Sequence, residues 1–193
     1  MHRSGWEDSV VPSEETMRHY SNIMAGLLAV GVAVLGSLAI AQTANRMTAT
    51  DSTFVTKAAQ GGMAEVKLGQ LAEQKAMSPD VKNFGQTMVT DHTKANDELK
   101  ALASSKGITL PSEIDSKDQA TYDRLSKLSG AEFDRAYMKD MVSDHKTDVG
   151  EFKRQAVRGA DVDLKAWAAK TLPTLEHHLQ MAESVDAKVK GEK

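Results

Sequence analysis

A pentapeptide containing an Asp-His pair occurs twice in this chain, and this repeat most constrains the fold. Residues 88–92 read MVTDH and residues 141–145 read MVSDH, 53 positions further along. In both copies an aromatic residue stands four positions before the Met, and a hydrophobic residue followed by Lys stands seven positions after the His. Spacings of four and seven place these residues on one face of a helix. The repeat therefore predicts two helices with the same apolar face and a histidine at its centre.

The hydrophobic periodicity of the remaining chain predicts two further long helices. The four long segments cover about residues 51–77, 79–104, 131–158 and 161–189, and a shorter helix is expected over 116–128. Aromatic residues make up 5% of the chain and prolines number 4, which favours helix over strand. The first and last connections are short and the central one is long. An all-α fold is expected, namely an antiparallel four-helix bundle at 51–189 with a short extra helix in its central connection.

The first 41 residues have the pattern of an export signal. An uncharged apolar run covers residues 23–40, and the small residues Ala39-Ile40-Ala41 end it. A basic flank, an apolar core and an A-x-A ending are typical of a secretory signal peptide cleaved after Ala41. The alternative is an uncleaved inner-membrane anchor over 23–41, since about 20 apolar residues span a bilayer. Because the first residues are polar and acidic, we expect translation to start at Met17. Residues 42–50 are expected to be a linker and residues 190–193 a charged tail. The export signal predicts a periplasmic or cell-envelope protein.

Composition excludes several classes of function. The chain contains 0 cysteines, so it has no disulfide, thiolate metal site or cysteine nucleophile. Its net charge of −3 is mild and well mixed, which argues against a nucleic-acid surface. Contact with a membrane is expected only through the N-terminal segment, if that segment is uncleaved.

Four polar residues stand where the helical periodicity requires an apolar side chain, one on each long helix: Glu65, His92, His145 and His178. Counted from the helix ends, Glu65 and His92 differ in height by only ~3 Å, and His145 and His178 by ~6 Å. A buried carboxylate and buried imidazoles need partners. Convergence on one Zn or Cu ion would satisfy all four. A hydrogen-bonded network without metal, or histidines at the edge of the core, are the alternatives.

Other residues are candidates for a supporting role or for replacing one of the four ligands. The Asp before each repeated histidine points about 100° away and could support an imidazole. Glu176 or His177 could replace His178. A methionine one turn before each repeated histidine is more often a core residue, but leaves a copper site open. These supporting and alternative residues are Asp91, Asp144, Glu176, His177, Met88 and Met141.

A set of residues spread along the chain matches a known pattern: Phe54-Val55, Ala64-Glu65, the SPDVKNF and MVTDH segments at 78–84 and 88–92, Phe133-Asp134, Tyr137, His145 and the LPTLEHHL segment at 172–179. Through these residues the chain resembles, from about Phe54 to Val185, an exported bacterial family known as domain of unknown function 4142. The resemblance implies a ferritin-like bundle in the cell envelope and no particular activity. Ferritin-like di-iron sites use Glu-x-x-His on two helices. Val89, Val142 and Leu175 stand at the Glu positions here, which makes a di-iron pair less expected than Zn or Cu.

Two hypotheses about function follow. The first is an exported helical bundle that binds a metal ion at its centre. The second is a metal-free envelope or stress-response module that binds a partner in the envelope, whose identity the sequence leaves open. The sequence contains no nucleophile-base motif, phosphate loop or paired acid-base carboxylates, so an enzyme is less expected.

Overall fold

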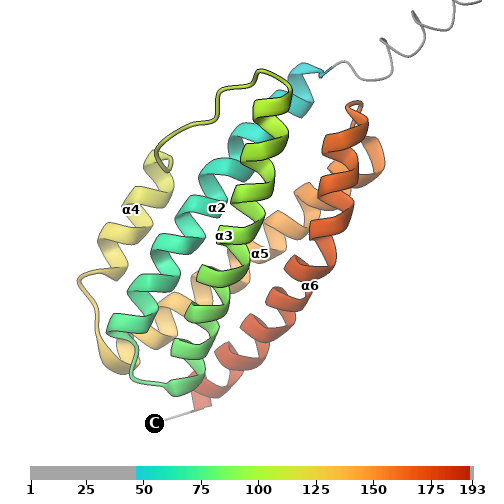
Figure 1. Ribbon diagram of the computed structural model, residues 1–193. Helices are drawn as coiled ribbons and strands as arrows, with labels where there is room; N and C mark the ends of the chain where they lie inside the picture. Colours follow the sequence, from blue (N-terminus) through green and yellow to red (C-terminus); the bar gives the residue numbers. More distant parts are fainter. Residues whose placement is uncertain (1–46, 192–193) are drawn as a thin grey trace, which may run out of the picture. The chain divides into compact units, whose positions relative to one another are not determined.

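The computed structural model describes residues 47–191, which form five α-helices and no strand (Figure 1). The helices are α2 (Ala49–Lys75), α3 (Pro79–Ser105), α4 (Ser116–Leu125), α5 (Gly130–Arg158) and α6 (Val162–Gly191). The hairpin partners α2 and α3 pack together most extensively, as do α5 and α6, and α3·α6 and α2·α5 contacts complete the bundle. The predicted all-α four-helix bundle is confirmed.

The central connection makes every neighbouring pair of long helices antiparallel. After α3 ends, the chain runs back along the outside of the bundle through α4, which packs on α2 and α5 (Figure 1). Helix α5 therefore starts at the same end of the bundle as α3 and runs parallel to it. This single long crossover is the ferritin-like connection.

The observed helix ends differ from the predicted ones by two residues at both ends of α2 and at the end of α6, and by three at the end of α4. Thr48 is the N-cap of α2, because Thr48 and Asp51 form a reciprocal capping box. The backbone N–H of Asp51 donates to Thr48 Oγ1 at 3.2 Å, and that of Thr48 donates to Asp51 Oδ2 at 3.0 Å. The first helical residues consequently lie within the segment expected to be a linker. Asp161 caps α6, accepting a hydrogen bond from the N–H of Leu164 at 2.9 Å.

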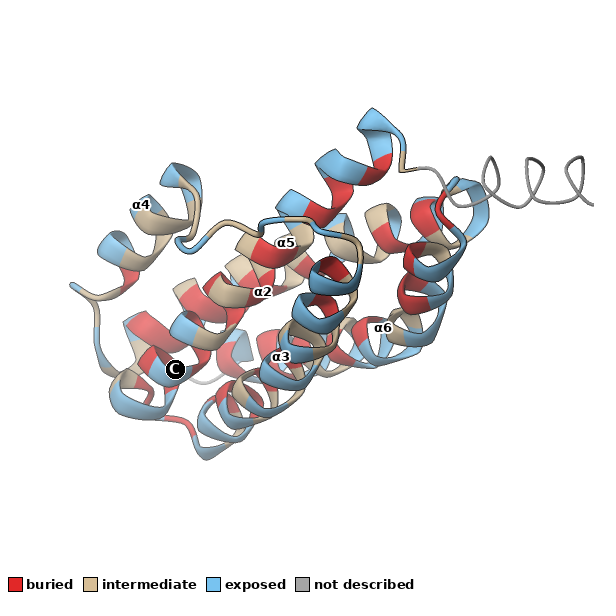
Figure 2. Ribbon diagram, turned by 45° about the horizontal axis from the view of Figure 1, so that its top comes forward, coloured by how far each residue is buried: buried red, intermediate tan, exposed pale blue. Residues whose placement is uncertain are grey.

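The apolar core consists of two clusters, one toward each end of the bundle, and Figure 2 shows the buried residues on the inner helix faces. One cluster contains Leu68, Phe84, Tyr137 and Ala182, and the other contains Phe54, Leu99, Phe152 and Leu175. Along each long helix the predicted polar residue falls between the residues of the two clusters. The bundle therefore has a polar layer near its middle.

Glycines allow α2 and α3 to approach closely beside this layer. A Cβ atom at Gly69 would lie 2.6 Å from the backbone oxygen of Gly85, and one at Gly85 would lie 2.8 Å from that of Gly69. Real Cβ atoms do not approach a backbone oxygen so closely, so each helix needs a glycine at this crossing. Gly62 packs against Asn96, whereas a Cβ at Gly61 would meet nothing within 4 Å.

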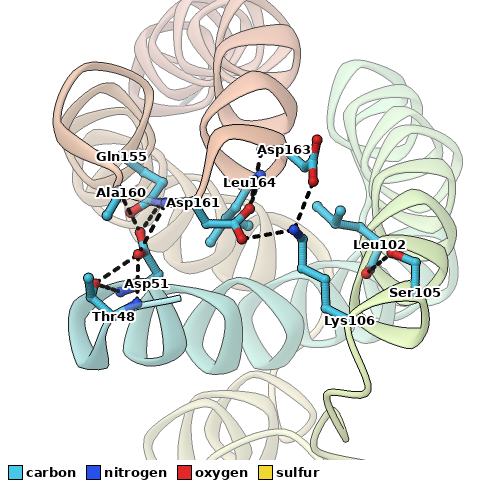
Figure 3. A network of polar contacts seen from close by, with 10 residues as sticks. All are labelled: Thr48, Asp51, Leu102, Ser105, Lys106, Gln155, Ala160, Asp161, Asp163 and Leu164. Atoms are coloured by element: carbon cyan, nitrogen blue, oxygen red, sulfur yellow. Dashed lines mark hydrogen bonds and ion pairs between the residues drawn. The ribbon is translucent and has the colours of Figure 1, made fainter. Parts of the chain in front are cut away.

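A polar network joins the helix ends at the end of the bundle where α2 begins (Figure 3). Asp51 accepts hydrogen bonds from Gln155 Nε2 at 2.7 Å and from the N–H of Ala160 at 3.2 Å. Lys106 donates to Asp161 and Asp163, both at 2.8 Å. The network connects the start of α2 to the α5–α6 turn, and the end of α3 to the start of α6.

The predicted leader at 1–41 and most of the linker at 42–50 lie outside the described residues, as does the end of the 190–193 tail. Within 47–191, no helix is long and apolar enough to cross a membrane.

Candidate metal centre

The structure brings three of the four predicted residues into one group at the middle of the bundle. His92 on α3, His145 on α5 and His178 on α6 are all buried. Their ring centroids lie 5.9 Å apart for His92 and His145, 5.4 Å for His92 and His178, and 5.5 Å for His145 and His178. One ring nitrogen from each lies within 4.8 Å of the other two.

Hydrogen bonds determine which nitrogen of two imidazoles carries the proton. His145 Nδ1 lies 3.0 Å from the backbone oxygen of Met141, which can only accept, so Nδ1 donates. His178 Nε2 lies 2.9 Å from Asp91 Oδ2 and donates to it. In the neutral rings, His145 Nε2 and His178 Nδ1 are therefore bare lone pairs. These two atoms and His92 Nε2 are buried and have no hydrogen-bond partner among the described residues.

Burial keeps these imidazoles neutral. It lowers the pKa of His145 to about 4, with the charge of His178 acting in the same direction and the Met141 hydrogen bond opposing it. Burial, with the charges of His145 and His178, also holds the pKa of His92 well below its usual value. Burial lowers the pKa of His178 although Asp91 opposes this. Near neutral pH, all three rings are in the form that binds metal.

Glu65, the fourth predicted residue, is placed in a different group. It is fully buried, and its Oε1 lies 3.7 Å from His145 Nδ1, the nitrogen that already donates to Met141. Its nearest carboxylates are Asp144 and Asp148, and one oxygen from each of the three lies within 4.8 Å of the others. His145 thus separates Glu65 from the bare lone pairs, and the polar layer contains an imidazole group beside a carboxylate group.

Protons are held strongly in the carboxylate group. Burial, together with the charges of Asp144 and Asp148, raises the pKa of Glu65 well above its usual value. Burial and the charge of Asp144 raise the pKa of Asp148 to about 8. Burial, then the charges of Asp115 and Asp144, raise the pKa of Asp118 on α4 to about 6. Sequence reasoning did not single out Asp148 or Asp118, although Asp144 and Asp148 lie four residues apart on the face next to Glu65.

The other predicted candidates have distinct places. Asp91 accepts a hydrogen bond from an imidazole. That imidazole belongs to His178 on α6 and not to His92, its neighbour in sequence. Asp144 belongs to the carboxylate group. Glu176 and His177 are exposed on α6, which leaves His178 as the residue of that segment in the centre. Met88 and Met141 are buried in the apolar cluster with Leu68 and Phe84.

A small cavity reaches both groups. Its volume is about 50 Å³, and His92 and Asp148 both line it, together with Gly61, Gly62, Asn96 and Trp167. One water needs at least about 10–15 Å³ of such space, so the cavity has room for a few waters. Water or a small ligand can therefore reach the imidazole of His92.

The fold and the centre together define a class, an antiparallel four-helix bundle with a buried histidine group in its polar middle layer. The chain belongs to the family described as Domain of unknown function (DUF4142), whose family model matches residues 37–185. No curated protein matches this chain.

Two solved structures share the fold. A DUF305 fragment from Deinococcus radiodurans superimposes with a TM-score of 0.65 at 15% sequence identity, covering 74% of this chain and 98% of that one. A protein described as "putative secreted protein DUF305 from Streptomyces coelicolor" gives a TM-score of 0.63 at 13% identity, covering 73% of this chain and 92% of that one. At these identities the likeness shows the fold alone.

Proposed function

We propose that this protein is an exported, metal-binding helical bundle whose His92, His145 and His178 hold one Zn²⁺ or Cu²⁺ ion. The observation that carries the proposal is the convergence of three imidazoles from three helices, each with a buried nitrogen that has no partner within residues 47–191. Unpaired buried polar atoms are costly, and a cation placed among them would remove that cost.

The spacing suits such an ion after a small adjustment. Zn–N bonds of about 2.0–2.1 Å place ligand nitrogens about 3.3 Å apart. The observed nitrogens lie within 4.8 Å of one another, so movements of under about 1 Å bring them onto a common ion. The hydrogen bonds from His145 to Met141 and from His178 to Asp91 hold two of the rings in the required orientation.

The choice of metal follows from the donors. Three imidazoles and no thiolate suit Zn and Cu, whereas Mg²⁺ and Ca²⁺ prefer oxygen. Because Glu65 belongs to the carboxylate group, the fourth position would be left to water from the cavity that His92 lines. A site with three protein ligands and one open position can bind a small ligand in addition to storing the ion.

Export is the second part of the proposal. It is supported by the apolar run at 23–40 with its A-x-A ending, and by the description of the Streptomyces coelicolor neighbour as secreted. N-terminal sequencing of protein from the envelope fraction tests it. A terminus at Gln42 is expected for a cleaved signal, and one at or near Met17 for an anchored chain. Recovery from the cytoplasm alone would contradict export.

The test of the metal site uses full-length protein purified without a His-tag. Zn²⁺ or Cu²⁺ should raise the melting temperature by about 5–10 °C at a hundredfold excess over Kd, since binding then adds about 2.7 kcal/mol. His92→Ala should abolish the rise. His177→Ala provides the matched control, because His177 is an exposed histidine beside His178.

An unchanged melting temperature with either ion, and no metal in the purified protein, would overturn the metal proposal. A metal-free envelope module that acts by binding a partner would then be the better account, with His92→Ala affecting only the stability of the bundle.

A further inference from the structure

A second group of ligand atoms lies beside the histidines and is built only from oxygen. Glu65 on α2 and Asp144 and Asp148 on α5 each direct one carboxylate oxygen to within 4.8 Å of the others. We propose that Glu65, Asp144 and Asp148 form a separate site for a hard divalent cation such as Mn²⁺ or Ca²⁺. This proposal does not rest on metal binding by the histidines.

The spacing fits a single ion. Oxygen ligands of Ca²⁺ lie about 2.3–2.6 Å from the ion, so oxygens on opposite sides of it are up to about 5 Å apart. Three carboxylate oxygens within 4.8 Å can therefore surround one ion with little movement. Asp144 and Asp148 lie one helical turn apart, so α5 provides two ligands on one face and α2 provides the third.

Glu65 supplies the independent observation. Its exposed fraction is 0%, and in the described part of the chain its oxygens have no hydrogen-bond partner other than the carboxyl group of Asp144, with which a proton can be shared. A buried carboxyl without a partner destabilises a core, and a cation is the partner that suits its oxygens. The side chain lies beside two further carboxylates, whose charges help to raise its pKa, so binding a cation would release a proton from this group.

The negative charge of this group is not compensated by lysine or arginine side chains. Within residues 47–191, none of the three carboxylates forms an ion pair with a Lys or Arg. Glu65 lies near one basic group, the imidazole of His145, whose Nδ1 is 3.7 Å away and donates to Met141. Asp118, in the first turn of α4, adds a fourth acidic side chain close enough to interact with Asp144 and Asp148.

An ion can reach the site from solvent. Asp144 and Asp148 are only partly buried, and Asp148 lines the same cavity as His92. Water in that cavity can complete the coordination shell, since ions of this kind keep several waters. Carboxylate and water favour Mn, Mg and Ca, whereas imidazole favours Zn and Cu. The two neighbouring groups are thus expected to bind different ions.

The experiment is a titration of the metal-free full chain with Mn²⁺, in which the electron paramagnetic resonance signal of free Mn²⁺ reports the amount bound. One ion per chain is expected, and Ca²⁺ should displace it. Asp148→Asn and Glu65→Gln should each weaken binding at least about tenfold, because each removes a charged ligand. Asp97→Asn removes an exposed carboxylate from α3 and should leave binding unchanged.

The histidine variants separate this proposal from the previous one. His178→Ala should remove the Zn²⁺ response and leave Mn²⁺ binding within about twofold, since its imidazole belongs to the other group. Mn²⁺ binding that is lost in His178→Ala but retained in Asp148→Asn would overturn the carboxylate site. So would no binding at millimolar Mn²⁺ by protein that still responds to Zn²⁺. Circular dichroism of each variant checks that the bundle is folded.

Discussion

The carboxylate of Asp91 on α3 accepts a hydrogen bond from the imidazole of His178 on α6, with Oδ2 and Nε2 2.9 Å apart. Asp91 directly precedes His92 in α3. The same turn of this helix therefore places the imidazole of His92 in the histidine centre and orients the imidazole of His178 from α6. The hydrogen bond holds the proton of His178 on Nε2 and leaves Nδ1 as the lone pair that faces the centre. Asp91 thus acts as a positioning residue for the proposed metal site.

Replacing Asp91 with Asn tests this role. The amide can present its NH₂ group to Nε2 and favour the opposite tautomer, so Zn²⁺ or Cu²⁺ affinity should fall about 10- to 100-fold while the bundle stays folded. Competition with a chromophoric chelator measures the affinity. Asp97→Asn, on the same helix and exposed, is the control. Unchanged affinity in Asp91→Asn would show that this hydrogen bond does not prepare the site.

The glycine contact between α2 and α3 leads to a prediction about stability. Gly85→Ala would place a Cβ 2.8 Å from the backbone oxygen of Gly69 and 2.9 Å from the Cβ of Ala72, so the helices must separate. A loss of about 1–3 kcal/mol in the free energy of unfolding is expected.

Gly61→Ala is the matched control, because its Cβ would meet nothing within 4 Å. It should raise stability by about 0.5–1 kcal/mol through its better helix propensity. Equal effects of the two substitutions in urea unfolding would contradict the close crossing.

The sequence predicted the helices well because their apolar periodicity is long and regular. The predicted and observed ends of α3 and α5 differ by one residue at most, since Pro79, Gly130 and Gly159 mark boundaries by their own backbone chemistry. The start of α2 was placed late because Asp51 has the side chain of an N-cap but serves as the third residue of a capping box. A single sequence does not reveal which of two polar residues three positions apart is the N-cap.

The candidate site was predicted in part for a similar reason. Periodicity identifies the inward face of a helix, and this was enough to place His92, His145 and His178 in the core. It does not give the rotation of each helix about its own axis. Glu65 is consequently inward as expected but beside Asp144 and Asp148, and Asp148 was missed because it lies at the edge of the apolar face.

The Asp51 network predicts a pH-dependent contribution to stability. Burial raises the pKa of Asp51, but hydrogen bonds from Gln155, Thr48 and Ala160 outweigh it and lower the pKa below the usual 3.8. Asp51→Ala removes a cap and several hydrogen bonds to a buried carboxylate (Figure 3), so about 2–4 kcal/mol should be lost near pH 7.

The sign of the pH effect follows from the lowered pKa. The contribution of Asp51 is fully present above pH 3.8 and is lost as the pH falls further, because the unfolded chain then binds the proton more tightly. The stability difference between wild type and Asp51→Ala should therefore shrink below pH 3.8 in urea titrations. Asp80→Ala, which removes an exposed ion pair with Lys188, should cost under about 1 kcal/mol. A difference that grows on acidification would contradict the assignment.

The burial of Glu65 leads to the prediction that this residue lowers the stability of the metal-free bundle while it contributes to cation binding. Its side chain is fully buried among the apolar residues of α2, and among residues 47–191 its carboxyl has no hydrogen-bond partner other than that of Asp144. Glu65→Leu exchanges this poorly satisfied carboxyl for an apolar side chain of similar size, so the metal-free variant should be about 1–3 kcal/mol more stable than wild type. It should also lose the Mn²⁺ binding proposed above, since α2 then contributes no ligand.

Glu73→Leu, an exposed replacement on the same helix, should change stability by less than about 0.5 kcal/mol. Thermal unfolding after treatment with a chelator measures both variants. A Glu65→Leu protein less stable than wild type would mean that the carboxyl is satisfied within the fold, and the physical reason for a cation beside it would disappear.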